Sequence, residues 1–133
     1  WRVERSYFAS PSLTTGAIDT ALRRGLEQAR ATRLPRVHVH RRLMAFLEEV
    51  LPSMPPGRRL LAHPREDHRL IAADVAGPRL LIAIGPEGGW IEREMATFVA
   101  RGFTGFTLGP RILRTEAAVP AILGWVAALR CGP

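Results

Sequence analysis

Three short apolar runs, each followed by a loop that contains glycine or proline, constrain the fold of this chain more than any other feature. The runs are Leu60–Ala62, Leu80–Ile84 and Phe103–Leu108. Continuous apolar runs of this length are typical of buried parallel strands. A helix is predicted between the last two runs, from about Ile91 to Arg101, with Met95, Phe98 and Val99 facing inward. Strands that alternate with helices predict an α/β fold with a mostly parallel sheet.

A further helix is predicted in the amino-terminal part, because apolar residues between Ile18 and Ala29 recur at the helical spacing. Thr14 or Thr15 can cap its first turn. Leu34-Pro35 would end it, since the residue before a proline is pushed out of the helical region. The other expected elements are a strand over residues 1–8, a turn at 10–12, a strand at Val37–His40, a short helix from Leu43 to Leu51, a loop at 53–57, and a last helix from Thr115 to about Leu129 that Pro120 disturbs.

The chain is strongly basic. It has 19 basic residues other than histidine, all of them arginine, against 12 acidic ones, which gives a formal net charge of +7 at pH 7. Arginine binds phosphate through a planar fork and stacks on bases, so this excess favours a nucleic-acid partner. A GC-rich genome would explain the missing lysine but not the excess charge. The arginines expected to bind RNA are Arg23, Arg24, Arg30, Arg33, Arg41 and Arg42.

Composition and motifs argue against several other classes of protein. A chain of 133 residues, 47% hydrophobic, is expected to form one domain over residues 1–133. No apolar run approaches the roughly 20 residues of a membrane span, and the single cysteine, Cys131, indicates no oxidising compartment, so the cytoplasm is expected. Dinucleotide, Walker A and nucleophile-elbow motifs are absent. No metal site is expected, because no cluster of cysteines or carboxylates accompanies His38, His40, His63 or His68.

The residues with chemical potential lie in the three loops that follow the apolar runs. The loops are Ala62–Pro64, Gly85–Trp90 and Gly109–Glu116. In open α/β sheets ligands bind beyond the carboxyl ends of the strands, and glycine there lets the backbone approach a ligand. One Gly-Pro pair would indicate only a turn. Three converging loops of this kind predict a ligand site.

These segments resemble the RsmE family of methyltransferases. Ile84–Gly89 followed by Leu108–Glu116 resembles the family's pair of signature motifs, and Leu26–Pro35 and Leu61–Pro64 resemble two further segments. The resemblance covers nearly the whole chain. It implies a SPOUT-type α/β methyltransferase domain with a carboxyl-terminal trefoil knot, which general topology rules would not propose. It also implies S-adenosyl-L-methionine as the cofactor and a homodimer.

The resemblance further implies which residues hold the cofactor and what the protein does. The implied reaction is methylation of N3 of a uridine in small-subunit ribosomal RNA. Methylation of another base or of a ribose 2′-hydroxyl, and a non-catalytic RNA-binding or ribosome-assembly module, stay open. The cofactor would lie in the knot, mainly against backbone groups, at Ala62, His63, Ile84, Gly85, Pro86, Glu87, Gly88, Gly89, Leu108, Gly109, Arg111, Ile112, Leu113 and Thr115.

The implied chemistry requires uridine N3 to lose its proton before or during methyl transfer. Arg114 is expected to stabilise the negative charge that results. Glu116, or Glu87, is expected to accept the proton or to position the base. Glu116 can also be explained as a residue that only stabilises the start of the last helix, next to Thr115.

The chain departs from the family pattern in three places. Trp90 stands where phenylalanine or leucine is usual, an exchange of one apolar side chain for another. Ala117 replaces a threonine, which removes one hydroxyl. Family members also have an amino-terminal, PUA-like RNA-binding domain and a first strand and helix of the catalytic domain. The chain is therefore expected to be a fragment whose substrate selection depends on the missing part.

Overall fold

The computed structural model describes residues 8–131. The chain divides into two compact units, joined between Met54 and Pro55, and each is described by itself. The sequence predicts one domain over residues 1–133. The predicted strand over residues 1–8 lies, except for Phe8, outside the described residues.

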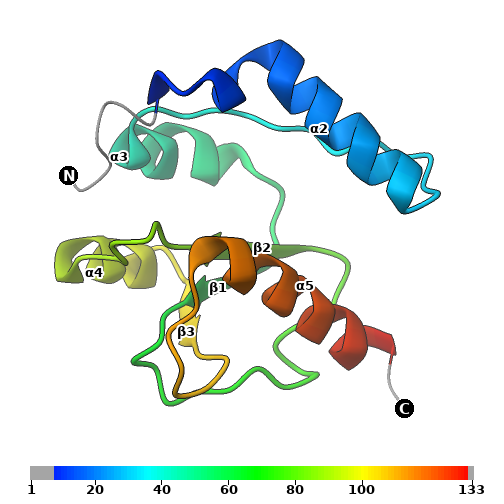
Figure 1. Ribbon diagram of the computed structural model, residues 1–133. Coiled ribbons are helices and arrows are strands. Elements are labelled where there is room, and N and C mark those ends of the chain that lie inside the picture. The colour runs from blue at the N-terminus through cyan, green and yellow to red at the C-terminus, as the bar shows by residue number, and fades with distance from the viewer. Residues whose placement is uncertain (1–7, 132–133) are drawn as a thin grey trace. The chain divides into compact units, whose positions relative to one another are not determined.

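Helical segments dominate the first unit (Figure 1). Helix α2 (Thr15–Gln28) begins where predicted, because the side chain of Thr14 accepts a hydrogen bond of 3.4 Å from the N–H of Ala17. The predicted turn before it is a short 3₁₀ helix, η1 (Pro11–Leu13). The predicted helix near residues 43–51 is confirmed as three consecutive segments: α3 (Leu43–Ala45), the π-helical η2 (Phe46–Val50) and the 3₁₀-helical η3 (Leu51–Ser53).

The carboxyl end of α2 differs from the prediction. The helix ends at Gln28, before the predicted proline stop, because Arg30 adopts a left-handed φ of 49°. The N–H of Ala31 bonds the carbonyl of Leu26 at 3.1 Å, and the N–H of Arg30 bonds that of Glu27 at 3.2 Å. This pair of bonds is the Schellman motif, in which glycine is the usual left-handed residue. Because this residue is an arginine, a prediction of the helix end from glycine and proline alone misses it.

The predicted strand Val37–His40 is wrong. Residues 31–40 have no regular secondary structure, and no described strand pairs with them. Val37 and Val39 are 51% and 49% exposed. Alternation of apolar and polar residues does not form a strand without a neighbour for the backbone N–H and C=O groups.

The second unit contains the predicted parallel sheet. Strands β1 (Arg58–Ala62), β2 (Leu80–Ile84) and β3 (Thr104–Phe106) are parallel and lie in the order β2-β1-β3. Helix α4 (Glu92–Ala100) connects β2 to β3, and α5 (Thr115–Cys131) follows β3 (Figure 1). All three strands and both helices are confirmed, with β3 shorter than its apolar run. Pro120 lies inside α5 without ending it.

The register of the sheet brings the carboxyl ends of the three strands to one level. Ala62, the last residue of β1, pairs with Ile84 at the end of β2 and with Phe106 at the end of β3. His63 continues this alignment, because its N–H donates to the carbonyl of Phe106 at 2.9 Å. The three loops of the sequence analysis therefore leave the sheet side by side.

The core of this unit lies between the sheet and α5. Phe106 is fully buried, and Leu60 and Ile122 are 2% and 1% exposed. The cluster also includes Leu70, Val75 and Val126. On α4, Phe98 is buried and packs edge-on against Trp90 and Phe103. The predicted inward position of Val99 is wrong, since that side chain is 58% exposed and lies about 100° around the helix from Phe98.

The connection from β1 to β2 contains no helix and is held by polar contacts. Asp74 accepts hydrogen bonds from the N–H of Ile71 at 2.9 Å and from Nε2 of His68 at 2.8 Å. Burial acts to raise the pKa of Asp74, but these two bonds and the charges of His68 and Arg58 outweigh it and lower that pKa. Side chains of α5 also donate to carbonyls of the connection: Arg130 to Val75 and Gly77, and Trp125 to Leu70.

Residues 8–131 contain neither a membrane-spanning helix nor a group of metal-binding side chains. No helix there has the length and apolar character needed to cross a membrane. No group of three or more histidine, cysteine, aspartate or glutamate side chains there is arranged to hold a metal ion.

Candidate functional site

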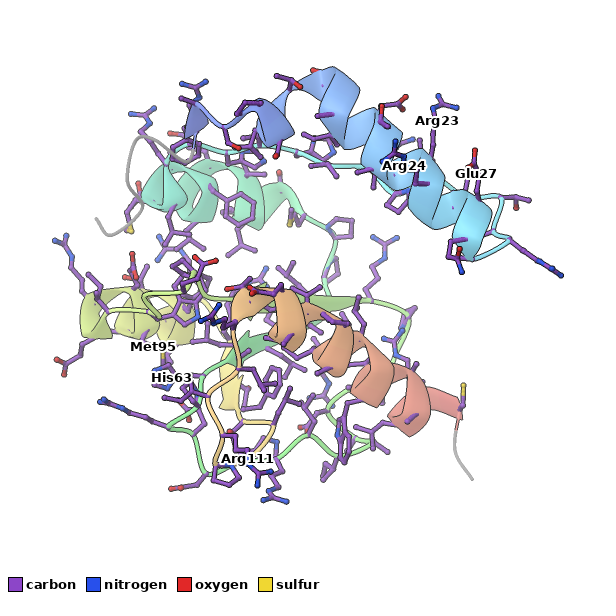
Figure 2. All side chains as sticks on the ribbon, in the orientation of Figure 1. Arg23, Arg24, Glu27, His63, Met95 and Arg111 are labelled. Carbon is purple, nitrogen blue, oxygen red and sulfur yellow. The ribbon has the colours of Figure 1, made fainter. Side chains whose placement is uncertain are left out.

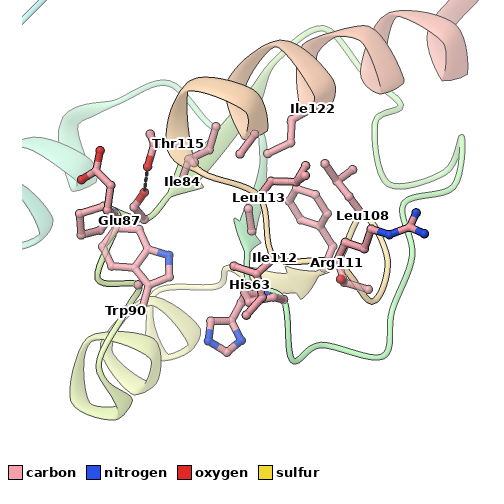
Figure 3. Close-up of a pocket in the computed structure, with 18 of the residues that line it drawn as sticks. His63, Ile84, Glu87, Trp90, Leu108, Arg111, Ile112, Leu113, Thr115 and Ile122 are labelled. Atoms are coloured by element: carbon pink, nitrogen blue, oxygen red, sulfur yellow. Dashed lines mark hydrogen bonds between the residues drawn. The ribbon is translucent and has the colours of Figure 1, made fainter.

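A pocket opens at the carboxyl edge of the sheet, where the three loops meet (Figure 3). It holds about 680 Å³ of empty space, which includes the open solvent at its mouth. Every residue that the sequence assigns to the cofactor lines this pocket, except Gly88. The lining residues that the sequence analysis did not assign are Pro64, Trp90, Phe106, Thr107, Ala118 and Ile122.

Three of these lining residues, Phe106, Ala118 and Ile122, had a signal in the sequence. Phe106 lies near the carboxyl end of the third apolar run, close to the edge where the loops begin, and it is the last residue of β3. Ala118 comes three residues after Thr115, and Ile122 comes four residues after Ala118. These helical spacings place the three residues on the same face of α5. For Trp90 the sequence predicts only an apolar packing role, because phenylalanine or leucine is usual at the corresponding position of the family it resembles.

The loop after β2 is a tight turn that folds back on the strand. The N–H of Gly89 bonds the carbonyl of Pro86 at 2.8 Å, and Gly89 has a left-handed φ of 70°. A β-carbon built on Gly89 would meet no atom within 4 Å, so this side of the loop faces open space. After the turn, the Trp90 indole packs against Gly85, where an added β-carbon would lie 3.3 Å from the indole nitrogen.

The loop after β3 is held at both of its ends. Near β3, the hydroxyl of Thr107 donates to the carbonyl of Gly109 at 3.0 Å and accepts from its N–H at 3.1 Å, and Gly109 has a φ of 133°. At the start of α5, the hydroxyl of Thr115 donates to the carbonyl of Gly85 at 3.1 Å (Figure 3). This last bond ties the loop after β3 to the loop after β2.

Replacing Thr115 by valine is expected to lower the free energy of unfolding by about 1 kcal/mol, because valine keeps the shape but leaves the Gly85 carbonyl without its donor. Ligand affinity at the pocket should fall as well, since the two loops are no longer tied. Thermal unfolding and calorimetric titration would measure both effects. Serine at this position should restore them. Thr97→Val, which removes a hydroxyl bonded within α4, is the matched control; equal behaviour of the two valine variants would contradict the role given to Thr115.

The loop after β1 supplies a histidine to the pocket. His63 lies in the wall, and its Nδ1 accepts a hydrogen bond of 3.3 Å from the N–H of Arg65. This bond requires a lone pair on Nδ1, so a neutral His63 carries its proton on Nε2. Farther along the loop, the Glu66 carboxylate packs against the α-carbon of Gly105 so closely that a β-carbon there would overlap it.

The two predicted catalytic residues lie beside the pocket, not in its wall. Arg114 directly follows Leu113, a pocket residue, and its carbonyl accepts the N–H groups of Ala117 and Ala118 at the start of α5. Glu116 lies in the first turn of α5, and its side chain is exposed. Glu87, the alternative acid, does line the pocket.

The six arginines predicted to bind RNA all belong to the first unit and all are exposed. Arg23 and Arg24 project from α2 (Figure 2). The Nε of Arg23 lies 2.7 Å from an oxygen of Asp19, so part of its charge is already compensated. The guanidinium of Arg41 lies 5.9 Å from the ring centre of Phe8, in a cation–π contact. The remaining four, Arg24, Arg30, Arg33 and Arg42, have no ion pair within residues 8–131.

The sequence of this chain is similar to those of known proteins. The family described as an RNA methyltransferase domain matches residues 1–127. A ribosomal RNA small subunit methyltransferase E of Treponema pallidum is 37% identical over 121 residues, which are 89% of this chain and 46% of that protein. The chain spans about half the length of the curated relatives it matches.

Two solved structures have similar folds. A probable rRNA-methyltransferase of Porphyromonas gingivalis aligns with a TM-score of 0.78 over 98% of this chain and 53% of that one, at 24% identity, a likeness of fold alone. A ribosomal RNA small subunit methyltransferase E of Neisseria gonorrhoeae, bound to S-adenosyl methionine, aligns with a TM-score of 0.57 over 80% of this chain and 48% of that one, at 29% identity.

Proposed function

This chain belongs to the RNA methyltransferase domain family, and from that premise we propose that it transfers a methyl group from S-adenosyl-L-methionine to N3 of a uridine in small-subunit ribosomal RNA. The main support is the pocket at the carboxyl edge of the sheet, where the loops that resemble the RsmE motifs meet. The relatives named ribosomal RNA small subunit methyltransferase E support the choice of substrate. A ribosomal substrate would place the reaction in the cytoplasm.

The residues of the pocket fit the proposed cofactor. Ile84, Leu108, Ile112 and Leu113 offer apolar contacts for an adenine ring. The open space beside Gly89 would let backbone groups of its loop approach the ligand. When bound, the cofactor supplies an electrophilic methyl group. The protein would hold that group in line with uridine N3, which alone provides much of the acceleration of a transfer reaction.

The side chains that would act on the base lie around this pocket. Arg114 would stabilise the negative charge that develops on the pyrimidine as the N3 proton leaves. Glu87, in the pocket wall, and Glu116, in the first turn of α5, are the two groups that would accept that proton or position the base. Single variants of each glutamate would identify the proton acceptor, because only loss of the residue that accepts the N3 proton changes the pH dependence of the transfer rate.

Two architectural features complete the proposal. A trefoil knot would form where the chain passes from β3 to α5, and the bond from Thr115 to Gly85, which holds this passage against the loop after β2, supports it. A homodimer would cover apolar side chains that α5 exposes: Val119, Leu123 and Trp125, which are 38%, 60% and 51% exposed. Both features are those implied by the RsmE resemblance.

The activity can be tested with small ribosomal subunits that lack the modification. Incubation with S-adenosyl-L-methionine carrying a labelled methyl group, followed by digestion and mass spectrometry of the nucleosides, is expected to yield 3-methyluridine. Label on a ribose 2′-hydroxyl or on another base would keep the enzyme class and overturn the target. Cofactor and RNA binding without any transfer would instead indicate a non-catalytic module.

RNA affinity is expected to depend on salt through the exposed arginines of the first unit. Each phosphate contact that is lost should reduce the slope of log K against log salt by about 0.7–0.9. Arg24→Ala and Arg33→Ala should therefore lower the slope, and Arg23→Ala should lower it less because Asp19 already compensates that charge. Arg93→Ala, on α4, is the control of equal charge. Filter-binding or fluorescence titrations from low to moderate salt would measure this slope. A binding constant that does not change with salt would remove RNA as the partner.

A further inference from the structure

One polar atom in the wall of the pocket has no partner. The indole nitrogen of Trp90 is buried and makes no hydrogen bond with any residue in the described part of the chain. In the other described tryptophan, Trp125, the same nitrogen donates to the carbonyl of Leu70 at 3.3 Å. An indole N–H can only donate, so Trp90 lacks an acceptor. Burial of such a group without an acceptor costs free energy.

The surroundings of Trp90 explain why the protein does not supply the acceptor. The indole contacts Phe98, edge-on at a centroid distance of 4.8 Å, and the backbone of Gly85. Two carbonyls of the loop already accept bonds, that of Gly85 from Thr115 and that of Pro86 from Gly89. A phenylalanine would pack here without leaving a donor unpaired.

The indole is also placed so that a ligand can supply the acceptor. Trp90 lines the pocket at the end where Glu87 and Thr115 lie, and Leu108 and Arg111 lie at the other end (Figure 3). The nitrogen is covered, with less than 1 Å² exposed, so an acceptor reaches it only if the wall shifts slightly. Such a shift is available to a loop in which Gly89 borders open space.

We propose that the Trp90 N–H donates a hydrogen bond to an oxygen of bound S-adenosylmethionine, either the carboxylate or a ribose hydroxyl. This inference rests on the proposed function. It makes Trp90 a cofactor-binding residue and not only an apolar replacement for phenylalanine or leucine. It also makes cofactor binding and a small movement of residues 86–90 a single event, because the donor becomes accessible only when the acceptor arrives.

The direct readout is the indole proton of Trp90 in ¹⁵N-labelled protein. Titration with S-adenosylhomocysteine, which has the same ribose and carboxylate, is expected to shift this resonance downfield, while the Trp125 resonance stays in place. Trp90→Phe should weaken binding by roughly 3- to 10-fold, the effect of one hydrogen bond. Trp90→benzothienylalanine keeps the bicyclic shape without the N–H and should weaken binding equally. Trp125→Phe, which removes a satisfied donor outside the pocket, should leave the affinity unchanged.

A second ligand identifies the acceptor. Methylthioadenosine has the ribose but no carboxylate. If Trp90→Phe weakens its binding as well, the ribose hydroxyl is the acceptor; if the loss occurs only with S-adenosylhomocysteine, the carboxylate is. Normal affinity of both Trp90 variants, together with an unmoved indole resonance in a wild-type protein that binds ligand, overturns this inference alone. Failure of the wild-type protein to bind either ligand overturns the proposed function, and this inference with it.

Discussion

Replacing Arg114 by alanine is expected to slow methyl transfer by about 10²–10³-fold and to leave the affinity for S-adenosylmethionine nearly unchanged, as for other donors that act mainly in the transition state. The Arg114 side chain is exposed next to the pocket and makes no hydrogen bond or ion pair within residues 8–131. Its contribution to the fold comes from its backbone carbonyl, which alanine retains. The guanidinium is therefore available to a base or a phosphate.

Single-turnover rates at saturating cofactor, on small ribosomal subunits that lack the modification, would measure this effect. Arg114→Lys should recover only part of the rate, because lysine lacks the planar pair of donors. Arg111→Ala is a useful comparison, since Arg111 lines the pocket and its loss should act mainly on cofactor affinity. A normal rate in Arg114→Ala would remove Arg114 from the mechanism. A joint loss of stability and cofactor binding would give it a structural role instead.

Replacing Phe106 by alanine is expected to lower the free energy of unfolding by about 3–5 kcal/mol. Phe106 is fully buried, ends β3 and belongs both to the core under α5 and to the wall of the pocket. Its removal would leave a cavity between the sheet and the helix. Whole domains are stable by only about 5–15 kcal/mol, so the loss is a large fraction of the total.

Urea unfolding followed by circular dichroism would measure this loss. Val99→Ala is the control, because Val99 is 58% exposed on α4 and its truncation should change the free energy of unfolding by no more than about 0.5 kcal/mol. If the two variants were equally stable, Phe106 would not be the centre of this core. If Val99→Ala proved the more destabilising, the inward position first expected for Val99 would regain support.

The part of the fold that follows from burial was predictable from the sequence. Continuous apolar runs such as Leu80–Ile84 are typical of strands in a parallel sheet, and every residue of this one is partly buried in the structure. The site followed from the same reasoning, since loops after parallel strands meet at one edge of the sheet. In the structure, Ala62 pairs with Ile84 and Phe106, so the three strands end at the same level of the sheet.

The errors arose where a contact, and not a pattern, decides the outcome. Val37–His40 alternates like a strand but has no described neighbour to pair with. Helix α2 ends at a Schellman motif built on Arg30, a residue that gives no stop signal. From the sequence, Trp90 is expected to be an ordinary apolar residue, because an unpaired N–H can be identified only when every neighbouring acceptor is known. The catalytic roles of Arg114 and Glu116 stay predictions for the same reason, since the base they would contact comes from another molecule.

Calorimetric titration of the protein with S-adenosylmethionine tests the central claim most directly, namely that the pocket between the three loops is a cofactor site. One molecule is expected to bind per chain, and at a ligand concentration of about 100 times Kd the protein should gain roughly 2.7 kcal/mol in free energy of unfolding. Gly89→Val should abolish the heat of binding. The valine side chain would enter the open space next to the loop, and Gly89 has a left-handed φ that valine rarely adopts. Absence of heat and of any thermal shift at millimolar cofactor in the wild-type protein, or full binding by the valine variant, would contradict the account.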